Sequence, residues 1–416
     1  MATQARGGKP LNILLVRVSS LGDVLHNLPM VADIARHFPD ANIDWVVEEG
    51  FVSLVRLNPR VRTIIPFALR RWRKSLGKPE TRAEIKAFFR TLRAQEYDYV
   101  FDTQGLLKTG VIMGAARVVK GGRKVGMANG SEGSGYEGIS RIFHNLSVPT
   151  DPRTHAVARG RIVAGAALGY PVDTPADFGL APLADDTPRP DWMPSAYAVF
   201  FHGTARDAKK WAPEHWIALG RALASMTILL PWGSPKEKAE AEHLAASLPN
   251  AQLLPRLSMA DAVLLARRAD LVIGVDTGLT HIAAAFVRPT VEIYADSPRW
   301  KTEGNWSPRI INLGDTGTPP TVDQVLAAAR TLLAGACDAP AVLVAVVAGP
   351  AAGAGAPVAA RTPRAGLPPA LGRAPGPVWQ GRVVFPRTGA VGARGIGGRD
   401  ARRRAAGQRL AGPVPR

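Results

Sequence analysis

A short polar turn at residues 275–281, Val-Asp-Thr-Gly-Leu-Thr-His, carries the clearest chemical signal in this sequence. The apolar run 271–275 before it is typical of a buried strand, and the pattern 281–286 after it is typical of a helix. The backbone N–H groups of Thr277 and Gly278 would then lie at a helix N-terminus, where free amides and the helix dipole attract a phosphate. An ordinary turn in which Asp276 or Thr277 caps the helix explains the pattern equally well.

A second polar turn, at residues 19–26, follows the first apolar run of the chain and reads Ser-Ser-Leu-Gly-Asp-Val-Leu-His. A carboxylate at the carboxyl end of a strand, here Asp23, is placed to act as a general base toward a substrate hydroxyl. A helix cap formed by Asp23 or Ser20 is the alternative, and the turn taken alone favours the cap.

Strands and helices that would position these turns alternate along the chain. We expect strands at 11–18, 43–47, 63–66, 97–102, 124–127, 197–202, 227–231, 252–254, 271–276 and 290–294. We expect helices at 24–37, 52–57, 80–94, 106–118, 154–168, 213–224, 236–247, 258–269, 279–287 and 322–334. This alternation predicts parallel sheets covered on both faces, whose ligands bind beyond the carboxyl ends of the strands.

The chain is therefore expected to be an α/β protein with two doubly wound, Rossmann-like domains that face a cleft. Its 416 residues are enough for two separate cores. The turn-rich stretch after residue 170 holds six prolines between 171 and 194 and marks an interdomain linker. The predicted parts are a flexible N-terminus at 1–10, a first domain at 11–170, a linker at 171–195, a second domain at 196–336 and a tail at 337–416.

The positive charge is unevenly spread along the chain. The formal net charge is +18, and residues 337–416 contribute 12 arginines, no lysine and two aspartates to it. This Ala, Gly, Pro and Arg composition is typical of a disordered segment. A basic arm that binds a membrane or nucleic acid and a shift of reading frame are the alternatives. The rest of the chain is moderately basic, which suits acidic substrates or an anionic membrane surface as well as DNA.

Cysteine and hydropathy patterns exclude several classes of protein. Cys337 is the single cysteine, which excludes a disulfide within the chain and is typical of a reducing compartment. No uninterrupted apolar run reaches the roughly 18 residues that would predict a membrane span. The first apolar run is shorter than a signal peptide requires. The turn after that run also lacks the glycine fingerprint of a dinucleotide-binding dehydrogenase.

Seven segments in order resemble the lipopolysaccharide heptosyltransferases of glycosyltransferase family 9. They lie at 16–29 (VRVSSLGDVLHNLP), 44–51 (DWVVEEGF), 70–74 (RRWRK), 102–108 (DTQGLLK), 202–211 (HGTARDAKKW), 230–233 (LPWG) and 275–281 (VDTGLTH). The resemblance runs from about residue 11 to residue 335 with the expected spacing, and the tail lies outside it.

The resemblance implies a GT-B fold and transfer of L-glycero-D-manno-heptose from ADP-heptose to the Kdo of Kdo-lipid A. It implies inversion of the anomeric centre and no metal or other cofactor. The segments at 44–51 and 70–74 favour transfer of the first core heptose, and transfer of the second heptose is the alternative. The lipid-linked acceptor implies a cytoplasmic protein in weak, charge-assisted contact with the anionic inner membrane of a Gram-negative bacterium. Nucleic acid is not an expected partner.

Matching the family motifs residue by residue assigns roles to two groups. Asp23 is expected to be the catalytic base, and Lys209 is expected to offset the charge of the departing ADP. The expected donor-binding residues are Thr204, Lys209, Glu237, Leu257, Asp276, Thr277, Gly278 and His281. Among these, Glu237 would hold the ribose hydroxyls and Leu257 would line the adenine pocket. A solvated loop lysine, a solvated helix start and a structural histidine are the alternatives for Lys209, Glu237 and His281.

Four basic residues are expected to form the acceptor side, where their guanidinium and ammonium groups would bind the Kdo carboxylate and the lipid A phosphates. They are Arg70, Arg73, Lys74 and Lys108; a solvated basic run or a nucleic-acid patch is the alternative. The sequence departs from the family at three places. Ala205 replaces a second hydroxyl residue, the glycine-rich loop 129–136 lacks an arginine that many members have, and 295–304 lacks the usual glycine-rich form.

Overall fold

The computed structural model describes residues 9–182 and 187–337. The predicted flexible N-terminus, up to residue 8, and the predicted tail from residue 338 onward lie outside the described residues, as do residues 183–186 of the predicted linker. Both sheets described below belong to one compact unit of the chain.

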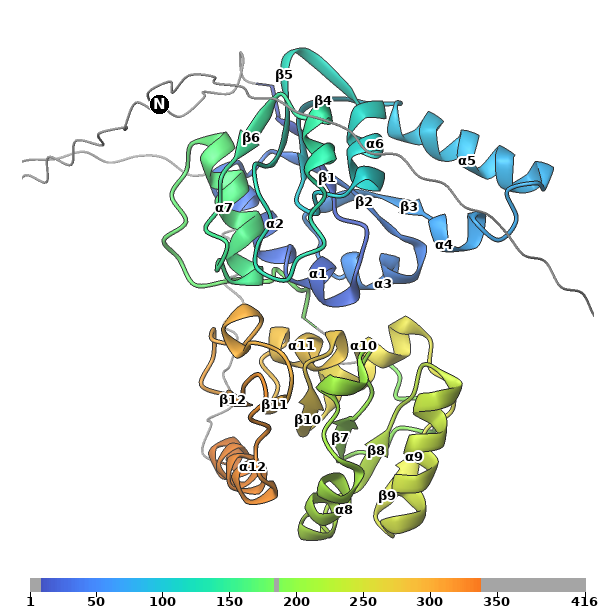
Figure 1. Ribbon diagram of the computed structural model, residues 1–416, viewed down its shortest axis with the longest axis vertical. Coiled ribbons are helices and arrows are strands. Elements are labelled where there is room, and N and C mark those ends of the chain that lie inside the picture. Colours follow the sequence, from blue (N-terminus) through green and yellow to red (C-terminus); the bar gives the residue numbers. More distant parts are fainter. Residues whose placement is uncertain (1–8, 183–186, 338–416) are drawn as a thin grey trace, which may run out of the picture. The chain divides into compact units, whose positions relative to one another are not determined.

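The first sheet has six parallel strands in the order β3-β2-β1-β4-β5-β6 (Figure 1). Its strands are β1 (Asn12–Val16), β2 (Asn42–Glu48), β3 (Val61–Phe67), β4 (Glu96–Asp102), β5 (Arg117–Met127) and β6 (Leu146–Val148). The helices that connect them are α1 (Leu21–Leu25), α2 (Leu28–His37), α3 (Val52–Val55), α4 (Leu69–Trp72), α5 (Pro79–Leu92), α6 (Leu107–Ala115) and α7 (Ala156–Leu168), with 3-10 turns η2 (Glu49–Phe51) and η3 (Gly138–Phe143).

The second sheet repeats this plan, with six parallel strands in the order β12-β11-β10-β7-β8-β9. Its strands are β7 (Ala198–Phe201), β8 (Ile228–Leu230), β9 (Ala251–Leu253), β10 (Leu271–Val275), β11 (Thr290–Tyr294) and β12 (Ile310–Gly314). Its helices are α8 (Pro213–Ala222), α9 (Pro235–Ser247), α10 (Met259–Arg268), α11 (Gly278–Ala285) and α12 (Val322–Cys337), with 3-10 turns η4 (Asp207–Lys209) and η5 (Arg299–Lys301). The predicted α/β class is confirmed, whereas the domain boundaries stay a prediction.

Each sheet is buried on both faces, as the apolar strands require. In β1, Ile13 and Leu15 join a core cluster with residues of α2 and α7, whereas Leu14 and Val16 join a second cluster with residues of α5 and α6. Successive side chains of a strand point to opposite faces, so one short run supplies both cores. A third cluster lies under α8, α9 and α12 in the second sheet.

Two predicted helices differ from the structure. The helix expected at 24–37 is two helices, α1 and α2, because Pro29 stands at the second position of α2 and disfavours a continuous helix through the preceding turn. The helix expected at 106–118 ends at Ala115, and the residues from Arg117 onward pair with β4 as part of β5. The β-branched pair at 118–119 favours this strand. Strands β6 and β12 were not expected from the sequence.

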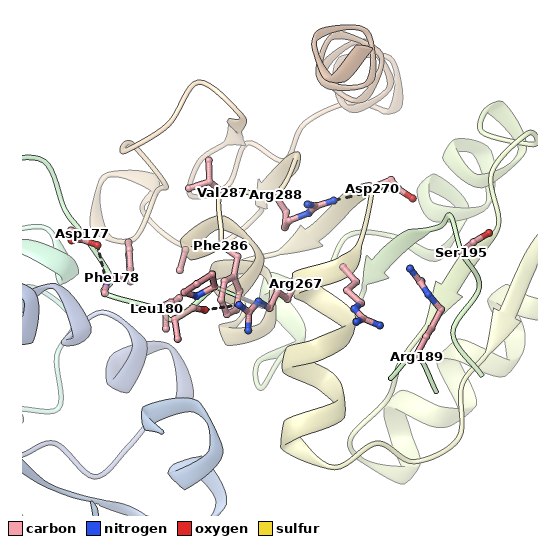
Figure 2. Close-up of a pocket in the computed structure, with 15 residues that line it drawn as sticks. Asp177, Phe178, Leu180, Arg189, Ser195, Arg267, Asp270, Phe286, Val287 and Arg288 are labelled. Carbon is pink, nitrogen blue, oxygen red and sulfur yellow. Dashed lines mark hydrogen bonds and ion pairs between the residues drawn. The ribbon is translucent and has the colours of Figure 1, made fainter. Parts of the chain in front are cut away.

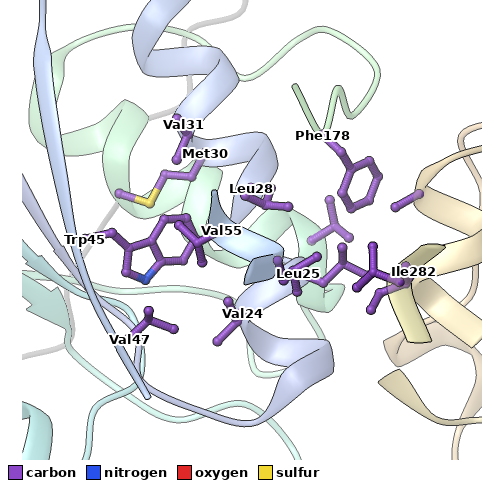
Figure 3. Packing of buried hydrophobic residues seen from close by; sticks show 14 of the residues in the cluster. Val24, Leu25, Leu28, Met30, Val31, Trp45, Val47, Val55, Phe178 and Ile282 are labelled. Carbon is purple, nitrogen blue, oxygen red and sulfur yellow. The ribbon is translucent and has the colours of Figure 1, made fainter. Parts of the chain in front are cut away.

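The first core cluster includes residues from both sheets and fixes α1 against α11. Figure 3 shows Leu25 of α1 beside Ile282 of α11, with Phe178 of the connecting segment close by. These side chains are fully or almost fully buried. The two turns singled out in the sequence are thus carried by two helices that pack on each other.

Candidate functional site

Asp23 lies in the first turn of α1, just beyond the carboxyl end of β1. Its Oδ2 accepts hydrogen bonds from the Ser20 backbone N–H at 3.0 Å and from the Ser20 hydroxyl at 2.9 Å. Its Oδ1 forms an ion pair with the Arg17 guanidinium at 2.6 Å. The carboxylate therefore serves as the helix cap that the sequence allowed, and its side chain still keeps 39% of its surface exposed.

The electrostatic surroundings keep Asp23 ionised. Burial alone would raise the pKa of this carboxyl group, but the Arg17 guanidinium and the two Ser20 hydrogen bonds outweigh burial and hold the pKa well below its usual range. A carboxylate offers about four acceptor positions, of which these contacts use three. Room remains on Asp23 for one more donor, such as a substrate hydroxyl.

The turn between β10 and α11 faces α1. Thr277 is the N-cap of α11 in extended conformation and makes no side-chain cap bond, so the first amides of this helix are not satisfied by their own cap. Gly278 is packed against Leu21 of α1 so closely that a Cβ on it would lie 2.9 Å from that side chain. Only glycine fits here, and the amide-bearing turn of α11 thereby comes next to the helix of Asp23.

His281, one turn into α11, is held between two carboxylates. Its Nδ1 lies 2.9 Å from Glu292 Oε1, and its Nε2 lies 3.0 Å from Asp276 Oδ1. Burial would lower the pKa of the imidazole, but Glu292 and Asp276 outweigh burial and raise it to about 10. Both ring nitrogens are engaged by protein, so His281 orients Asp276 and is not free to bond a phosphate.

Lys209 and Lys210 are adjacent in sequence but have different partners. The Lys209 ammonium donates to Asp276 Oδ2. Lys210 instead forms ion pairs with Asp207, at 3.0 Å, and with Glu240. Asp276 thus joins Lys209 to the His281 network. Burial would raise the pKa of Asp276, but His281 and Lys209 hold it well below the usual range.

The remaining predicted donor residues lie around the same loops. Glu237 caps α9: its Oε2 accepts from the N–H groups of Gly233, at 2.7 Å, and Ser234, at 2.9 Å. Gly203 is packed against this carboxylate, because a Cβ there would lie 2.9 Å from it. The Thr204 hydroxyl, in the same loop as Gly203, donates to the backbone carbonyl of Asp276 at 3.4 Å.

Leu257 precedes the N-cap of α10 and packs against the first core cluster. Its adenine-lining role stays a prediction.

Three of the four predicted acceptor residues line one groove. A cavity of about 710 Å³ is bordered by Arg70, Arg73 and Lys108 and floored by apolar side chains of α4, α5 and α6. Lys108 also reaches back toward the first turn, where its ammonium donates to the Ser19 hydroxyl at 3.2 Å. Lys74 borders a smaller neighbouring cavity of about 340 Å³, which shares Arg70 with the groove.

Two buried arginines that the sequence did not single out interact electrostatically with Asp23. Arg17 belongs to a quoted motif, yet its pairing with Asp23 requires knowledge of the turn. Arg159, on α7, is 7% exposed, and its Nε and one terminal nitrogen have no hydrogen-bond partner. Burial and the charge of Arg17 lower the pKa of Arg159, and Asp23 opposes them, which leaves this pKa at about 10. The sequence did contain one signal for this site, because Arg159 is a charged residue on the apolar face of a predicted helix.

A separate cavity of about 550 Å³ lies where the predicted linker meets α10 and α11 (Figure 2). Its arginines hold backbone carbonyls: Arg267 donates to Ala181 at 2.5 Å, and Arg288 donates to Ala269 at 2.7 Å. Figure 2 shows the Arg267 guanidinium beside Phe286 and the Arg288 guanidinium directed toward Asp270. Arg267 fastens the linker to α10, whereas Arg288 joins the segment after α11 to the end of α10. The residues predicted to do chemistry do not line this cavity.

No group of three or more His, Cys, Asp or Glu side chains in residues 9–182 and 187–337 is arranged to hold a metal ion. Within the same ranges, no helix has both the length and the apolar character needed to cross a membrane.

Comparisons with known proteins agree with this geometry. Residues 85–328, more than half of the chain, match the model of glycosyltransferase family 9 (heptosyltransferase). The chain is 38% identical over 289 residues to lipopolysaccharide heptosyltransferase 1 of Pseudomonas aeruginosa, an alignment that covers 68% of this chain and 78% of the relative. It is 37% identical over 293 residues to lipopolysaccharide heptosyltransferase 1 of Escherichia coli K12, which covers 68% of this chain and 88% of the relative.

Solved structures give the same result. The E. coli heptosyltransferase WaaC with ADP matches with a TM-score of 0.66 at 34% identity and covers 76% of this chain and 98% of that chain. E. coli ADP-heptose lps heptosyltransferase II shares the fold, with a TM-score of 0.63 at 19% identity over 78% of this chain and 99% of that chain. The predicted GT-B fold is confirmed, and the chain belongs to glycosyltransferase family 9, the heptosyltransferases.

Proposed function

We propose that this heptosyltransferase moves L-glycero-D-manno-heptose from ADP-heptose to the Kdo of Kdo-lipid A during synthesis of the lipopolysaccharide inner core. The observation that carries the proposal is the approach of α1 to α11. It brings Gly22, the residue before Asp23, against Gly278 and His281, and His281 in turn bonds to Asp276, the partner of Lys209. A base and a diphosphate-binding group in one place are what an inverting transfer requires.

In the proposed reaction, Asp23 takes the proton of the acceptor hydroxyl while the hydroxyl oxygen forms a bond to the anomeric carbon of heptose. The bond from that carbon to the diphosphate oxygen breaks, and ADP leaves with the bonding electrons. Lys209 and the first amides of α11 offset the charge that develops on the leaving diphosphate. These groups supply the stabilisation, so we assign no metal or other cofactor to the step.

The second half of the chain, residues 196–336, is the proposed donor-binding domain. Glu237 would accept the ribose hydroxyls, since its carboxylate lies against the backbone at Gly203, in the loop that carries Thr204. Leu257 would contact the adenine face. Asp276, oriented by His281, would accept heptose hydroxyls and would keep Lys209 in place.

The first half, residues 11–170, is the proposed acceptor-binding domain, joined to the second by the linker at 171–195. Arg159 is the group best suited to the Kdo carboxylate, because a buried guanidinium with two unpartnered nitrogens, whose pKa responds to the charge of Asp23, needs an anion. Arg70, Arg73 and Lys108 would meet the phosphates of lipid A at the rim of the groove. Lys74 would add charge beside them.

The groove also supports contact with a lipid surface. Leu76, Leu107 and Val111 border it and are 54%, 45% and 44% exposed. Exposed apolar side chains next to cations are typical of surfaces that lie on an anionic bilayer. We propose that the protein works at the cytoplasmic face of the inner membrane of a Gram-negative bacterium, held there through this groove.

One assay tests the function. ADP-heptose and Kdo-lipid A are incubated with the full chain, and the mass of the product is read directly. A mass increase of one heptose is expected. Transfer only to an acceptor that already carries a heptose would support the alternative, addition of the second heptose, and no transfer to either acceptor would contradict the proposal.

A further inference from the structure

The loop between β11 and β12 reaches the candidate site from the second sheet. The Thr302 hydroxyl donates to Asp276 Oδ1 at 3.3 Å, and the Gly304 N–H donates to Glu292 Oε2 at 3.0 Å. Both acceptors belong to the carboxylate pair that holds His281. The residue just before Thr302, Lys301, is therefore placed by a loop whose position is fixed to the donor side of the site.

The same loop touches the first half of the molecule. The Lys301 ammonium donates to the backbone carbonyl of Glu132 at 2.8 Å, and the His155 ring nitrogen Nε2 lies 3.0 Å from the carbonyl of Glu303. Gly133 has a φ of +60°, and a Cβ there would lie 3.3 Å from the Lys301 ammonium, so glycine permits this approach.

These contacts join the two segments in which the sequence departs from the family pattern. Residues 129–136 lack the arginine that the resemblance leads one to expect in the acceptor loop, and residues 295–304 lack the usual glycine-rich form. In this chain a lysine from the second segment reaches the first segment. A cation is thus supplied to the acceptor loop from the other half of the molecule.

Lys301 stands in a group of charges that is not neutralised by protein. Arg159 lies one turn after His155 on α7, and His155 contacts the Glu303 carbonyl in the loop of Lys301. The charges of Arg159, Asp23, Lys209 and Asp276 all act on the pKa of Lys301. Asp23 is already paired with Arg17, and Asp276 is already paired with Lys209. Among the described residues, no ion pair joins Arg159 or Lys301 to a carboxylate. Two neighbouring cations without a counter-charge form a site for an anion.

We propose that Lys301, together with Arg159, binds the carboxylate of an acidic acceptor sugar beside Asp23 and so determines acceptor specificity. This inference rests on the proposed function and adds a residue from the donor half to acceptor recognition. Burial and the positive charge of Arg159 lower the pKa of Lys301, as expected of an ammonium group that has no anion bound to it. An ammonium has three donors, and the bond to Glu132 uses one, which leaves two for the ligand.

The acceptor carboxylate is favoured over the leaving diphosphate as the partner of Lys301. The Lys301 ammonium bonds to Glu132, and the following residues of its loop contact His155 at the start of α7, so the loop is held against the acceptor half. The diphosphate already has Lys209 and the α11 amides. Acceptor binding would therefore require both halves of the site, because Arg159 and Lys301 come from different halves and meet on one carboxylate.

The test compares two acceptors, Kdo-lipid A with its free carboxylate and the corresponding methyl ester, in wild type, Lys301→Met and Lys301→Arg. The matched control is Arg299→Met, which removes a cation from the same turn; Arg299 forms an ion pair with Glu303 at 3.1 Å. The wild type is expected to prefer the free acid in kcat/KM. Lys301→Met should reduce that preference about tenfold, through the acceptor KM, and Lys301→Arg should restore part of it.

ADP-heptose affinity, measured by calorimetry, should be unchanged in Lys301→Met, and Arg299→Met should keep the preference of the wild type. A full preference for the acid in Lys301→Met, or an equal loss of donor affinity, would overturn the inference. Wild-type transfer to both acceptors at equal rates would also overturn it while leaving the proposed function intact. Failure of the wild type to transfer heptose to either acceptor would overturn the proposed function and this inference with it.

Discussion

At the scale of single residues, Asp23 is defined by its ion pair with Arg17. The guanidinium is 8% exposed, and it also donates to the backbone carbonyl of Thr103, so its position is fixed by the first sheet. A fixed cation keeps Asp23 ionised and orients it, at the cost of some basicity. The balance between these two effects can be measured from the pH dependence of the reaction.

Replacing Arg17 with methionine should move the acid limb of the pH profile to higher pH. The cation favours the ionised form of Asp23, so its removal raises the pKa of the carboxyl group, and the base becomes protonated at a higher pH. We expect a shift of about one to three units in the profile of kcat/KM, which reports on the free enzyme. Arg17→Lys keeps the charge and should shift the limb less. Identical acid limbs in the wild type and both variants would show that Arg17 does not control Asp23.

At the scale of elements, several of the proposed site residues lie at the N-termini of helices. Glu237 caps α9 and is also the proposed ribose ligand, so its two roles must be separated. Gln324 makes a comparable reciprocal cap at the start of α12, where it accepts from the Thr321 N–H at 2.9 Å. It is not among the residues proposed to bind substrate and provides a matched control.

Glu237→Ala and Gln324→Ala should each lower the free energy of unfolding by about 1 to 2 kcal/mol, because Glu237 accepts two bonds at the start of α9 and Gln324 accepts one at the start of α12. Only Glu237→Ala should weaken ADP-heptose binding, by about tenfold or more, since it also removes a charged acceptor for the ribose hydroxyls. Urea unfolding and calorimetry measure the two quantities. Equal donor affinities in the two variants would mean that Glu237 acts only as a helix cap.

Much of the element order could be predicted from the sequence because strand and helix periods are local. The apolar run at 271–275 and the turn after it lie in the structure where the pattern predicts them. The strands β6 and β12 could not be predicted, because a serine interrupts Leu146–Val148 and Asn312 interrupts Ile310–Gly314, so neither is a continuous apolar run like 271–275. The site was only partly predictable. The roles proposed for Arg159 and Lys301 depend on residues that are distant in the sequence, such as Asp23. No local sequence pattern predicts that these residues act together.

At the scale of the whole molecule, the basic groove of α4, α5 and α6 is the proposed contact with the membrane. Within the run at 70–74, Arg71 provides a control for Arg70 and Arg73. Arg71 is paired with Glu49, at 3.1 Å, and with Glu84, at 2.7 Å, whereas Arg70 and Arg73 border the groove. A paired guanidinium has less charge to offer to lipid headgroups.

The double variant Arg70→Gln/Arg73→Gln should bind vesicles that contain phosphatidylglycerol more weakly than the wild type, on the order of tenfold or more, because each cation near an anionic surface contributes about 1 kcal/mol. The control double variant, Arg71→Gln/Arg117→Gln, removes the same charge from paired arginines. Sedimentation at low and moderate salt measures the binding, and both variants keep the arginine-rich residues 338–416. Equal loss in both would mean that net charge, not the groove, holds the protein to the membrane.

The central claim is that a carboxylate from α1 deprotonates the acceptor while groups around α11 hold the donor. Single-turnover transfer by Asp23→Asn tests it most directly, because asparagine keeps the helix cap and removes the base. With ADP-heptose affinity checked by calorimetry, we predict a rate at least about 10²-fold below that of the wild type and an unchanged dissociation constant for the donor. A transfer rate within twofold of the wild type, at equal donor affinity, would contradict the account.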